Sequence, residues 1–192
     1  MSPVWKRALI VAPVFLVAAV AAGFKWVEVH NTLATQRAAV AEQWTQVESA
    51  LNARAALMPE VVEIVRKFAG NDESLVHNLE GSGAALAAAH TPLEKMRAND
   101  RLSNALGRVL VAAESNPKLR SDSGFSTLQD EIADSENRIA IERRKYNEIL
   151  EHYNAQIQIF PDNVVASVSG FRRNDDYFKT DGANTTGPKV QF

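Results

Sequence analysis

The sequence contains no cysteine. A chain without thiols cannot form disulfides, thiolate zinc sites or cysteine-ligated iron–sulfur clusters, and it has neither a cysteine nucleophile nor a lipoprotein-type cysteine anchor. The sequence also lacks an excess of charge of either sign, because 21 Lys and Arg residues stand against 23 Asp and Glu residues. A chain this close to neutral gives no overall electrostatic case for binding nucleic acid, so no nucleic-acid partner is expected.

The motifs of common enzyme classes are missing as well. The sequence contains no Gly-x-Ser-x-Gly elbow, Walker loop, Rossmann glycine fingerprint or His-Glu-x-x-His helix. Helical bundles can bind two metal ions through Glu-x-x-His pairs, which are three positions apart. The pairs found here, Glu73 with His77 and Glu148 with His152, are four positions apart and no set of carboxylates accompanies them. We therefore expect no enzymatic activity, no metal and no cofactor.

The one long apolar run begins at Ala8, ends at Phe24 and carries no charged residue. Its length is just sufficient to cross a bilayer core. Trp5 and Trp26 flank it, and tryptophan is enriched at the two membrane interfaces. We therefore predict a transmembrane helix over residues 8–27, preceded by a short flank over residues 1–7.

Two other interpretations of the apolar run remain open. Lys6 and Arg7 precede it, as basic residues do in a cleaved signal peptide. A helix buried in a protein core fits less well, because the run has no polar face. For a membrane helix, the basic residues before the run favour a short amino-terminal end in the cytoplasm and the bulk of the chain outside it.

Long helices are predicted after the apolar run. Residues 27–58 place apolar side chains at steps of three and four, which is typical of a coiled-coil-like seam. Arg37 lies in this seam, and we interpret it as a residue whose stem packs while its head reaches a carboxylate or the membrane interface, rather than as a ligand-binding residue.

Pro59 either kinks this helix or begins the next one. Gly81 and Gly83 lie in an alanine-rich run and indicate close helix packing rather than a phosphate-binding loop.

Start and stop signals divide the remainder of the chain. Thr91 and Glu94 have the spacing of a capping box, with Pro92 at the first helical position, and predict a helix that runs to about residue 114. The Asn116-Pro117 pair ends that helix, and residues 121–124 are expected to form a loop.

The predicted fold is all-α. An elongated antiparallel bundle of about four long helices is expected over residues 28–178, because long apolar-faced helices joined by short loops bury those faces against one another. The last of these helices is expected over residues 125–160, which contain no Gly or Pro. The polar, glycine-containing residues 179–192 are expected to form a disordered tail.

Two stripes run along the helix expected over residues 125–160. The apolar stripe consists of Leu128, Ile132, Ile139, Tyr146, Leu150, Tyr153, Ile157 and Phe160. The polar stripe consists of Glu136, Arg143, Asn147 and Asn154, which project within about 40° of one another on a helix. We expect a polar network with neighbouring helices, Arg37 and Arg54 included, that fixes the helix register. Recognition of a peptide or lipid headgroup, and a catalytic site, are the alternatives.

The same residues belong to a longer series of motifs. The series comprises Asn31, Leu33, Arg37, Val40, Trp44, Val47, Leu51, Arg54, Leu57, Pro59, Leu102, Ser103, Leu106, Gly107, Arg108, Glu114, Pro117, Phe125, Leu128, Gln129, Glu131, Ile132, Glu136, Asn137, Arg138, Ile139, Ala140, Arg143, Tyr146, Asn147, Tyr153, Asn154, Ile157, Phe160, Pro161, Gly170, Phe171, Tyr177 and Phe178. In these positions the chain resembles the LemA family of bacterial single-pass membrane proteins. It departs from the family pattern at Ala53 and Ala56, where arginine and an acidic residue are usual, and through most of residues 80–98.

The resemblance implies an amino-terminal membrane helix and a helical bundle with no known enzymatic activity. Relatives are linked to the cell envelope, and one branch to magnetosome formation. We therefore expect a membrane-anchored, non-enzymatic scaffold or interaction protein, located in the bacterial cytoplasmic (inner) membrane. The expected partners are the lipid bilayer and envelope proteins, with homo-oligomerisation as a further option. The alternative function is an envelope sensor that binds a small ligand, peptide or lipid headgroup along the polar stripe.

Overall fold

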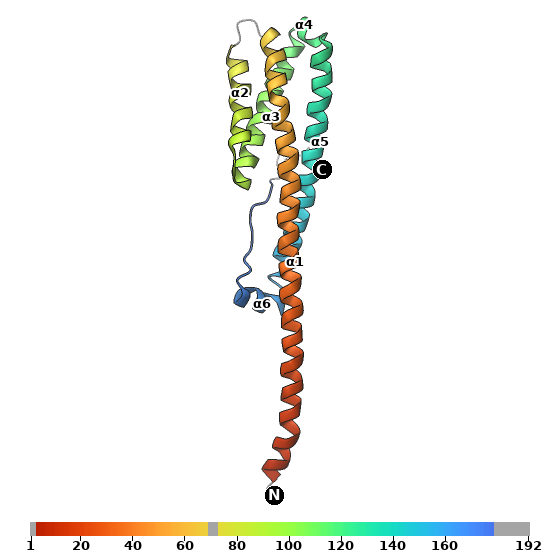
Figure 1. The fold of residues 1–192 in the computed structure, drawn as a ribbon, viewed down its shortest axis with the longest axis vertical. Helices are drawn as coiled ribbons and strands as arrows, with labels where there is room; N and C mark the ends of the chain where they lie inside the picture. The colour runs from red at the N-terminus through yellow and green to blue at the C-terminus, as the bar shows by residue number, and fades with distance from the viewer. Residues whose placement is uncertain (1–2, 69–72, 179–192) are drawn as a thin grey trace, which may run out of the picture. The chain divides into compact units, whose positions relative to one another are not determined.

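The computed structural model describes residues 3–68 and 73–178, without the side chains of residues 3–12 and of Val14. The chain forms α1 (Pro3–Phe68), α2 (Glu73–Ala88), α3 (Pro92–Glu114), α4 (Pro117–Arg120), α5 (Ser123–Gln156) and α6 (Asp162–Ser169), as Figure 1 shows. These ranges contain no strand, so the all-α prediction is confirmed for them. The predicted disordered tail over residues 179–192 lies outside the described residues.

The chain divides into two compact units. The first unit consists of residues 1–41 and 149–175, and the second of residues 42–148 and 176–192. The helices α1 and α5 each contribute to both units, because the divisions after residues 41 and 148 fall inside these helices; the third division, after residue 175, follows α6.

The second unit is a helical bundle with alternating helix directions. Within it, the later part of α1 and α3 run in one direction, while α2 and the first part of α5 run in the other (Figure 1). Short connections between α2 and α3 favour this antiparallel arrangement. The buried core is contributed by Val47, Leu51, Val61, Val65, Leu79, Leu86, Leu102, Leu106, Leu128, Ile139 and Tyr146, among others.

The helix α1 continues without a break through Pro59. Proline inside a helix removes one backbone hydrogen bond and crowds the preceding turn. The apolar neighbours Met58, Val61 and Val65 are all buried against the bundle, and this packing favours continuation of the helix. Pro59 therefore does not begin a new helix, which was one of the two interpretations of the sequence.

The capping box at the start of α3 is confirmed. The Thr91 hydroxyl accepts a hydrogen bond from the Glu94 N–H at 3.2 Å, and the Glu94 carboxylate accepts one from the Thr91 N–H at 3.0 Å. The prediction of a loop at residues 121–124 is wrong in its second half, because α5 already begins at Ser123. The Asp122 carboxylate accepts a hydrogen bond from the Phe125 N–H at 2.8 Å, so an aspartate cap starts the helix earlier than glycine content suggests.

The helix α5 ends at Gln156, four residues before the predicted end. Pro161 disfavours helical geometry at the residue before it, and the chain turns over residues 157–161. Seven members of the predicted apolar stripe are buried, but Phe160 is 77% exposed and does not belong to it. The apolar stripe therefore ends at Ile157.

The first unit combines α6 and the end of α5 with the earlier part of α1. Val165 and Ala166 of α6 are buried, and α6 is followed by Gly170, whose φ of +76° is readily adopted by glycine. The Phe171 ring then makes an edge-to-face contact with His30 of α1, at 5.4 Å between ring centroids.

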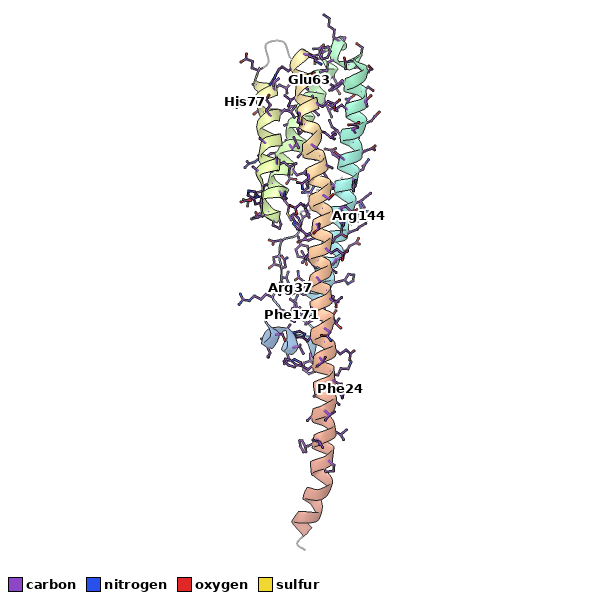
Figure 2. All side chains as sticks on the ribbon, in the orientation of Figure 1. Phe24, Arg37, Glu63, His77, Arg144 and Phe171 are labelled. Carbon is purple, nitrogen blue, oxygen red and sulfur yellow. The ribbon has the colours of Figure 1, made fainter. Side chains whose placement is uncertain are left out.

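The prediction of a transmembrane helix over residues 8–27 is not supported. Among the described residues, no helix reaches the length and apolar character needed to cross a membrane. The side chains of residues 8–12 and Val14, which belong to the predicted span, lie outside the described ones. The described part of this stretch exposes large apolar side chains, namely Phe15, Leu16, Val17, Val20 and Phe24, the last labelled in Figure 2.

Candidate functional site

A buried arginine joins three helices of the second unit. The side chain of Arg54 on α1 is 1% exposed. Its Nη1 donates to the Asn99 Oδ1 at 2.8 Å and to the Ser103 Oγ at 3.0 Å, both on α3. Its Nη2 donates to the Glu136 Oε1 at 2.5 Å, on α5.

The chemistry of this cluster favours a structural role. Burial lowers the pKa of Arg54, while the charge and hydrogen bond of Glu136 act in the opposite direction. A buried guanidinium is tolerated only when partners satisfy it, so these contacts select one relative position of α1, α3 and α5. The guanidinium is enclosed and its two Nη atoms are engaged by three side chains, so of the charged pair only the Glu136 carboxylate, whose side chain is 49% exposed, reaches solvent.

A second buried cation lies on α3 and was not predicted from the sequence. Lys95 is 4% exposed, and its Nζ lies 3.2 Å from a Glu48 carboxylate oxygen and 3.4 Å from the Asn52 Oδ1. The sequence does contain a signal for this site. Lys95, Asn99 and Leu102 follow one another at steps of four and three, which places the two polar residues on the same helix face as the buried Leu102. Polar residues on the core face of α3 therefore complement polar residues on α1.

Arg143 of the polar stripe contacts an aromatic cluster. Its Nη2 donates to the Asp100 Oδ1 at 3.3 Å, and its guanidinium carbon lies 4.5 Å from the centroid of the Phe178 ring. Phe178 in turn stacks on Trp44 at 6.0 Å and meets Tyr146 edge-on at 5.7 Å. The cation–π contact is consistent with packing of this residue rather than with an open anion site.

Asn147 forms hydrogen bonds with the backbone of Phe178, the aromatic residue that Arg143 contacts. Its Nδ2 donates to the Phe178 carbonyl oxygen at 2.8 Å, and its Oδ1 accepts from the Phe178 N–H at 2.9 Å. A side-chain amide thus supplies both hydrogen bonds that a neighbouring strand would supply to an extended residue. Asn147 therefore holds the 3%-exposed Phe178 in place.

Asn154 repeats this chemistry in the first unit. Its Nδ2 donates to the Asn174 carbonyl oxygen at 2.5 Å, and its Oδ1 accepts from the Asn174 N–H at 3.0 Å. Next to it, the Tyr153 hydroxyl donates to the Arg172 carbonyl oxygen at 2.9 Å. The backbone after α6 is therefore held by side chains of α5 rather than by regular secondary structure.

The predicted polar residues thus have separate partners. Glu136 meets Arg54, as the network hypothesis required, whereas Arg143 contacts Asp100 and Phe178, and both asparagines bind backbone groups. The Gln43 Nε2 on α1 donates a hydrogen bond to the carboxylate of Glu142, the residue before Arg143, at 2.6 Å. Sequence reasoning missed the extended segment over residues 171–178 as the main partner, because backbone acceptors carry no sequence signal.

Arg37 joins none of these interactions. Its exposed side chain forms no ion pair with any residue that the structure describes, and it lines a cavity of about 230 Å³ within the first unit. The cavity is lined by Arg37, Val40, Tyr153, Gly170, Arg172 and Asn174. In Figure 2, Arg37 is labelled on α1 near Phe171, which follows α6.

Comparison with known proteins connects most of the chain, including parts of both units, to a family. The LemA family matches residues 43–192. The chain belongs to the LemA family.

Three curated relatives are similar over a shorter stretch. Magnetosome proteins MamQ 2 and MamQ 1 of Paramagnetospirillum magneticum are each 33% identical to the chain over 89 residues, which is 46% of this chain and 32% of the relative. Magnetosome protein MamQ of Magnetospirillum gryphiswaldense is 32% identical over 89 residues, with the same coverage. The match therefore spans about a third of the length of these relatives.

The LemA-family match includes some of the polar residues and leaves out another. It begins at residue 43, so it contains Arg54, Glu136, Arg143 and both asparagines, but not Arg37. The Arg37 cavity therefore combines two residues before the match, Arg37 and Val40, with four residues inside it.

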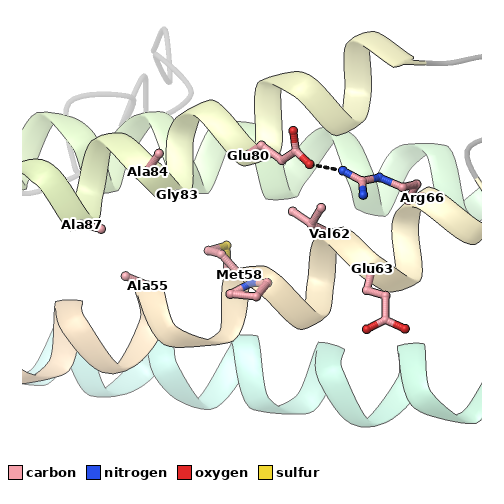
Figure 3. A pocket seen from close by; sticks show the side chains of 10 residues that line it. Ala55, Met58, Val62, Glu63, Arg66, Glu80, Gly83, Ala84 and Ala87 are labelled. Carbon is pink, nitrogen blue, oxygen red and sulfur yellow. Dashed lines mark hydrogen bonds and ion pairs between the residues drawn. The ribbon is translucent and has the colours of Figure 1, made fainter.

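A second hollow of this LemA-family chain lies between α1 and α2 (Figure 3). It has a volume of about 460 Å³ and is lined by Ala55, Met58, Pro59, Val62, Glu63, Arg66, Glu80, Gly83, Ala84 and Ala87. An ion pair between Arg66 and Glu80 lies at one end. A Cβ on Gly83 would lie 3.0 Å from the Met58 Cγ, so this glycine allows close packing, whereas nothing lies within 4 Å of such an atom on Gly81.

Among residues 3–68 and 73–178, no group of three or more His, Asp or Glu side chains is placed to hold a metal ion. The polar groups of the bundle instead serve helix register, backbone pairing and aromatic packing.

Proposed function

We propose that this LemA-family protein is a membrane-attached, non-enzymatic scaffold of the bacterial envelope, which presents its helical surface to partner proteins. The observation that carries the proposal is the contrast between the buried polar groups of the second unit and the hollow on its surface. The polar side chains of the bundle are engaged with one another, while the hollow between α1 and α2 is lined mainly by small and apolar side chains. Such a hollow suits packing against a partner more than it suits chemistry.

Membrane attachment is supported by the amino-terminal part of α1. Residues 8–24 contain no charged side chain, and the described large apolar side chains among them are exposed. An exposed run of this kind is unfavourable in water and favourable in a bilayer. The relatives named as magnetosome proteins fit an envelope role, and the basic residues Lys6 and Arg7 favour placing the bulk of the protein outside the cytoplasm.

Fractionation of cells tests the attachment. The double variant Val17→Lys/Val20→Lys puts two charges into the apolar run and is expected to move the protein from the membrane to the soluble fraction. The matched control, Gln46→Lys/Ser49→Lys, adds the same charges at the same spacing on an exposed face of α1 and is expected to stay with the membrane. An alkaline wash separates a spanning helix, which resists extraction, from a peripheral one. Equal behaviour of the two double variants would contradict attachment through this run.

Site-specific photocross-linking tests the scaffold role. A photoreactive amino acid at Ala84, on the wall of the hollow, is expected to give a discrete cross-linked protein in intact cells. The same amino acid at Arg144, an exposed position of α5, serves as the control and is expected to give none of that product. Identical products from both positions would argue against a partner at the hollow.

Ligand recognition along the polar stripe is less well supported. The amide groups of Asn147 and Asn154 already form two hydrogen bonds each with backbone groups. A ligand would have to displace those bonds, at a cost of about 1 kcal/mol or more for each.

A further inference from the structure

The cavity beside Arg37 differs in charge from the hollow between α1 and α2, which is lined by two glutamates and one arginine. Two of its six lining residues are arginines, Arg37 and Arg172, and none is acidic. Neither guanidinium forms an ion pair or hydrogen bond with the part of the chain that the structure describes. The nearest acidic residue in sequence, Asp175, already pairs with Arg173 at 2.5 Å. Two like charges that share a cavity repel each other and favour an anion between them.

The frame of this cavity is fixed by hydrogen bonds. Tyr153 holds the Arg172 carbonyl oxygen, and Asn154 holds both backbone groups of Asn174. Gly170 turns the chain at the end of α6. The backbone that carries Arg172 is therefore positioned before any ligand arrives, which lowers the entropic cost of binding.

Tyr153 does not neutralise the two arginines. Burial raises the pKa of its phenol, although the charge of Arg37 and the Arg172 backbone contact act in the opposite direction. The hydroxyl therefore stays uncharged at neutral pH and keeps donating to the Arg172 carbonyl oxygen. Because no carboxylate of residues 3–68 and 73–178 forms an ion pair with either guanidinium, both are available to an anion from the solution.

The dimensions of the cavity limit the ligand to a small one. Its volume of about 230 Å³ is below the range of about 300 to 1,000 Å³ typical of sites for drug-sized molecules. Guanidinium groups match the geometry of phosphate oxygens and bind them through paired, charge-assisted hydrogen bonds. We propose that the first unit binds a phosphate group between the side chains of Arg37 and Arg172. This site is independent of the scaffold role.

The phosphate can come from a soluble molecule or from a lipid headgroup. Phe24, the last residue of the apolar run, lies thirteen residues before Arg37, which corresponds to about 20 Å along a helix. The headgroup layer on one side of a bilayer is only about 5 to 8 Å thick. If α1 leaves a membrane steeply, Arg37 lies beyond the headgroups, which favours a soluble phosphate.

Calorimetric titration of the full chain with inorganic phosphate, in a detergent free of phospholipid and at constant ionic strength, tests the site. Arg37→Gln and Arg172→Gln are each expected to weaken binding by about tenfold or more, because each removes charge-assisted hydrogen bonds. Arg144→Gln removes an exposed arginine of α5, labelled in Figure 2, and is expected to bind as the wild type does. Circular dichroism verifies that all three variants are folded.

A second arm identifies the source of the phosphate. The chain is placed in nanodiscs of phosphatidylcholine alone or with added phosphatidate, and hydrogen exchange is measured over residues 170–174. Protection that appears only with phosphatidate, and is lost in Arg37→Gln and Arg172→Gln, identifies a lipid headgroup. Phosphate binding that is the same in both kinds of disc identifies a soluble ligand. The proposal is overturned if neither arm detects binding, or if both arginine variants bind as tightly as Arg144→Gln.

Discussion

Arg54 and Arg37 lie on the same helix, α1, but in different units and in opposite environments. Arg54 is enclosed and engaged by side chains of α3 and α5, whereas Arg37 is exposed at a cavity that it shares with a second arginine. Burial of a guanidinium requires partners supplied by the protein, so Arg54 specifies how helices meet. An exposed guanidinium retains its hydration and can exchange water for a ligand. The comparison separates charge used for architecture from charge available for binding.

The largest expected effect is on stability, from the enclosed arginine. Arg54→Met leaves the buried Asn99 carbonyl oxygen without its donor, whereas the Glu136 carboxylate, whose side chain is 49% exposed, can regain water. We expect the free energy of unfolding to fall by about 2–3 kcal/mol. Arg37→Met is the matched variant and should change it by less than about 0.5 kcal/mol. Urea unfolding followed by circular dichroism measures both, and equal losses would remove the distinction between the two arginines.

The next effect concerns the backbone pairing in the second unit. Asn147→Leu leaves the N–H and carbonyl of Phe178 without their side-chain partner. We therefore expect the free energy of unfolding to fall by about 2 kcal/mol and hydrogen exchange at Phe178 to become faster. Asn137→Leu, at an exposed position of α5, is the control and should have little effect. Unchanged melting and unchanged exchange in Asn147→Leu would show that water replaces the asparagine without cost.

Local sequence signals predicted the helices better than they predicted the partners of the polar residues. The Thr91 cap and the period of the apolar stripe depend on residues a few positions apart, and the structure confirms both. The two asparagine pairings join positions 31 and 20 residues apart, and their acceptors are backbone atoms that any residue would provide. Periodicity could not identify residues 171–178 as a partner, because that segment is not a helix or a strand. Lys95 and Asn99 were recognisable in principle, since they interrupt the apolar face of α3.

A third prediction compares the two asparagines as supports for binding. Asn154→Leu releases the backbone of Asn174, which lines the cavity, so phosphate should bind roughly threefold more weakly through loss of preorganisation. Asn147→Leu acts on the second unit and should leave phosphate affinity unchanged. The same calorimetric titration distinguishes them. A similar loss in both variants would mean that the cavity depends on the stability of the whole chain rather than on its own frame.

The smallest effect is expected for Tyr153→Phe, which removes one hydroxyl from the wall of the cavity. Loss of its hydrogen bond to the Arg172 carbonyl oxygen should lower the free energy of unfolding by about 0.5 kcal/mol at neutral pH. Because folding raises the pKa of this phenol above 10.0, the neutral form favours the folded state. The advantage of the wild type over Tyr153→Phe is therefore fully present below about pH 10 and is lost as the pH rises through the raised pKa. Urea unfolding of both proteins between neutral and strongly alkaline pH measures this difference, and lysine titration cancels because both proteins contain the same lysines. An advantage that persists unchanged at the alkaline end would mean that the contribution of the hydroxyl does not depend on its proton, which would contradict the assignment of this stability to the hydrogen bond that it donates.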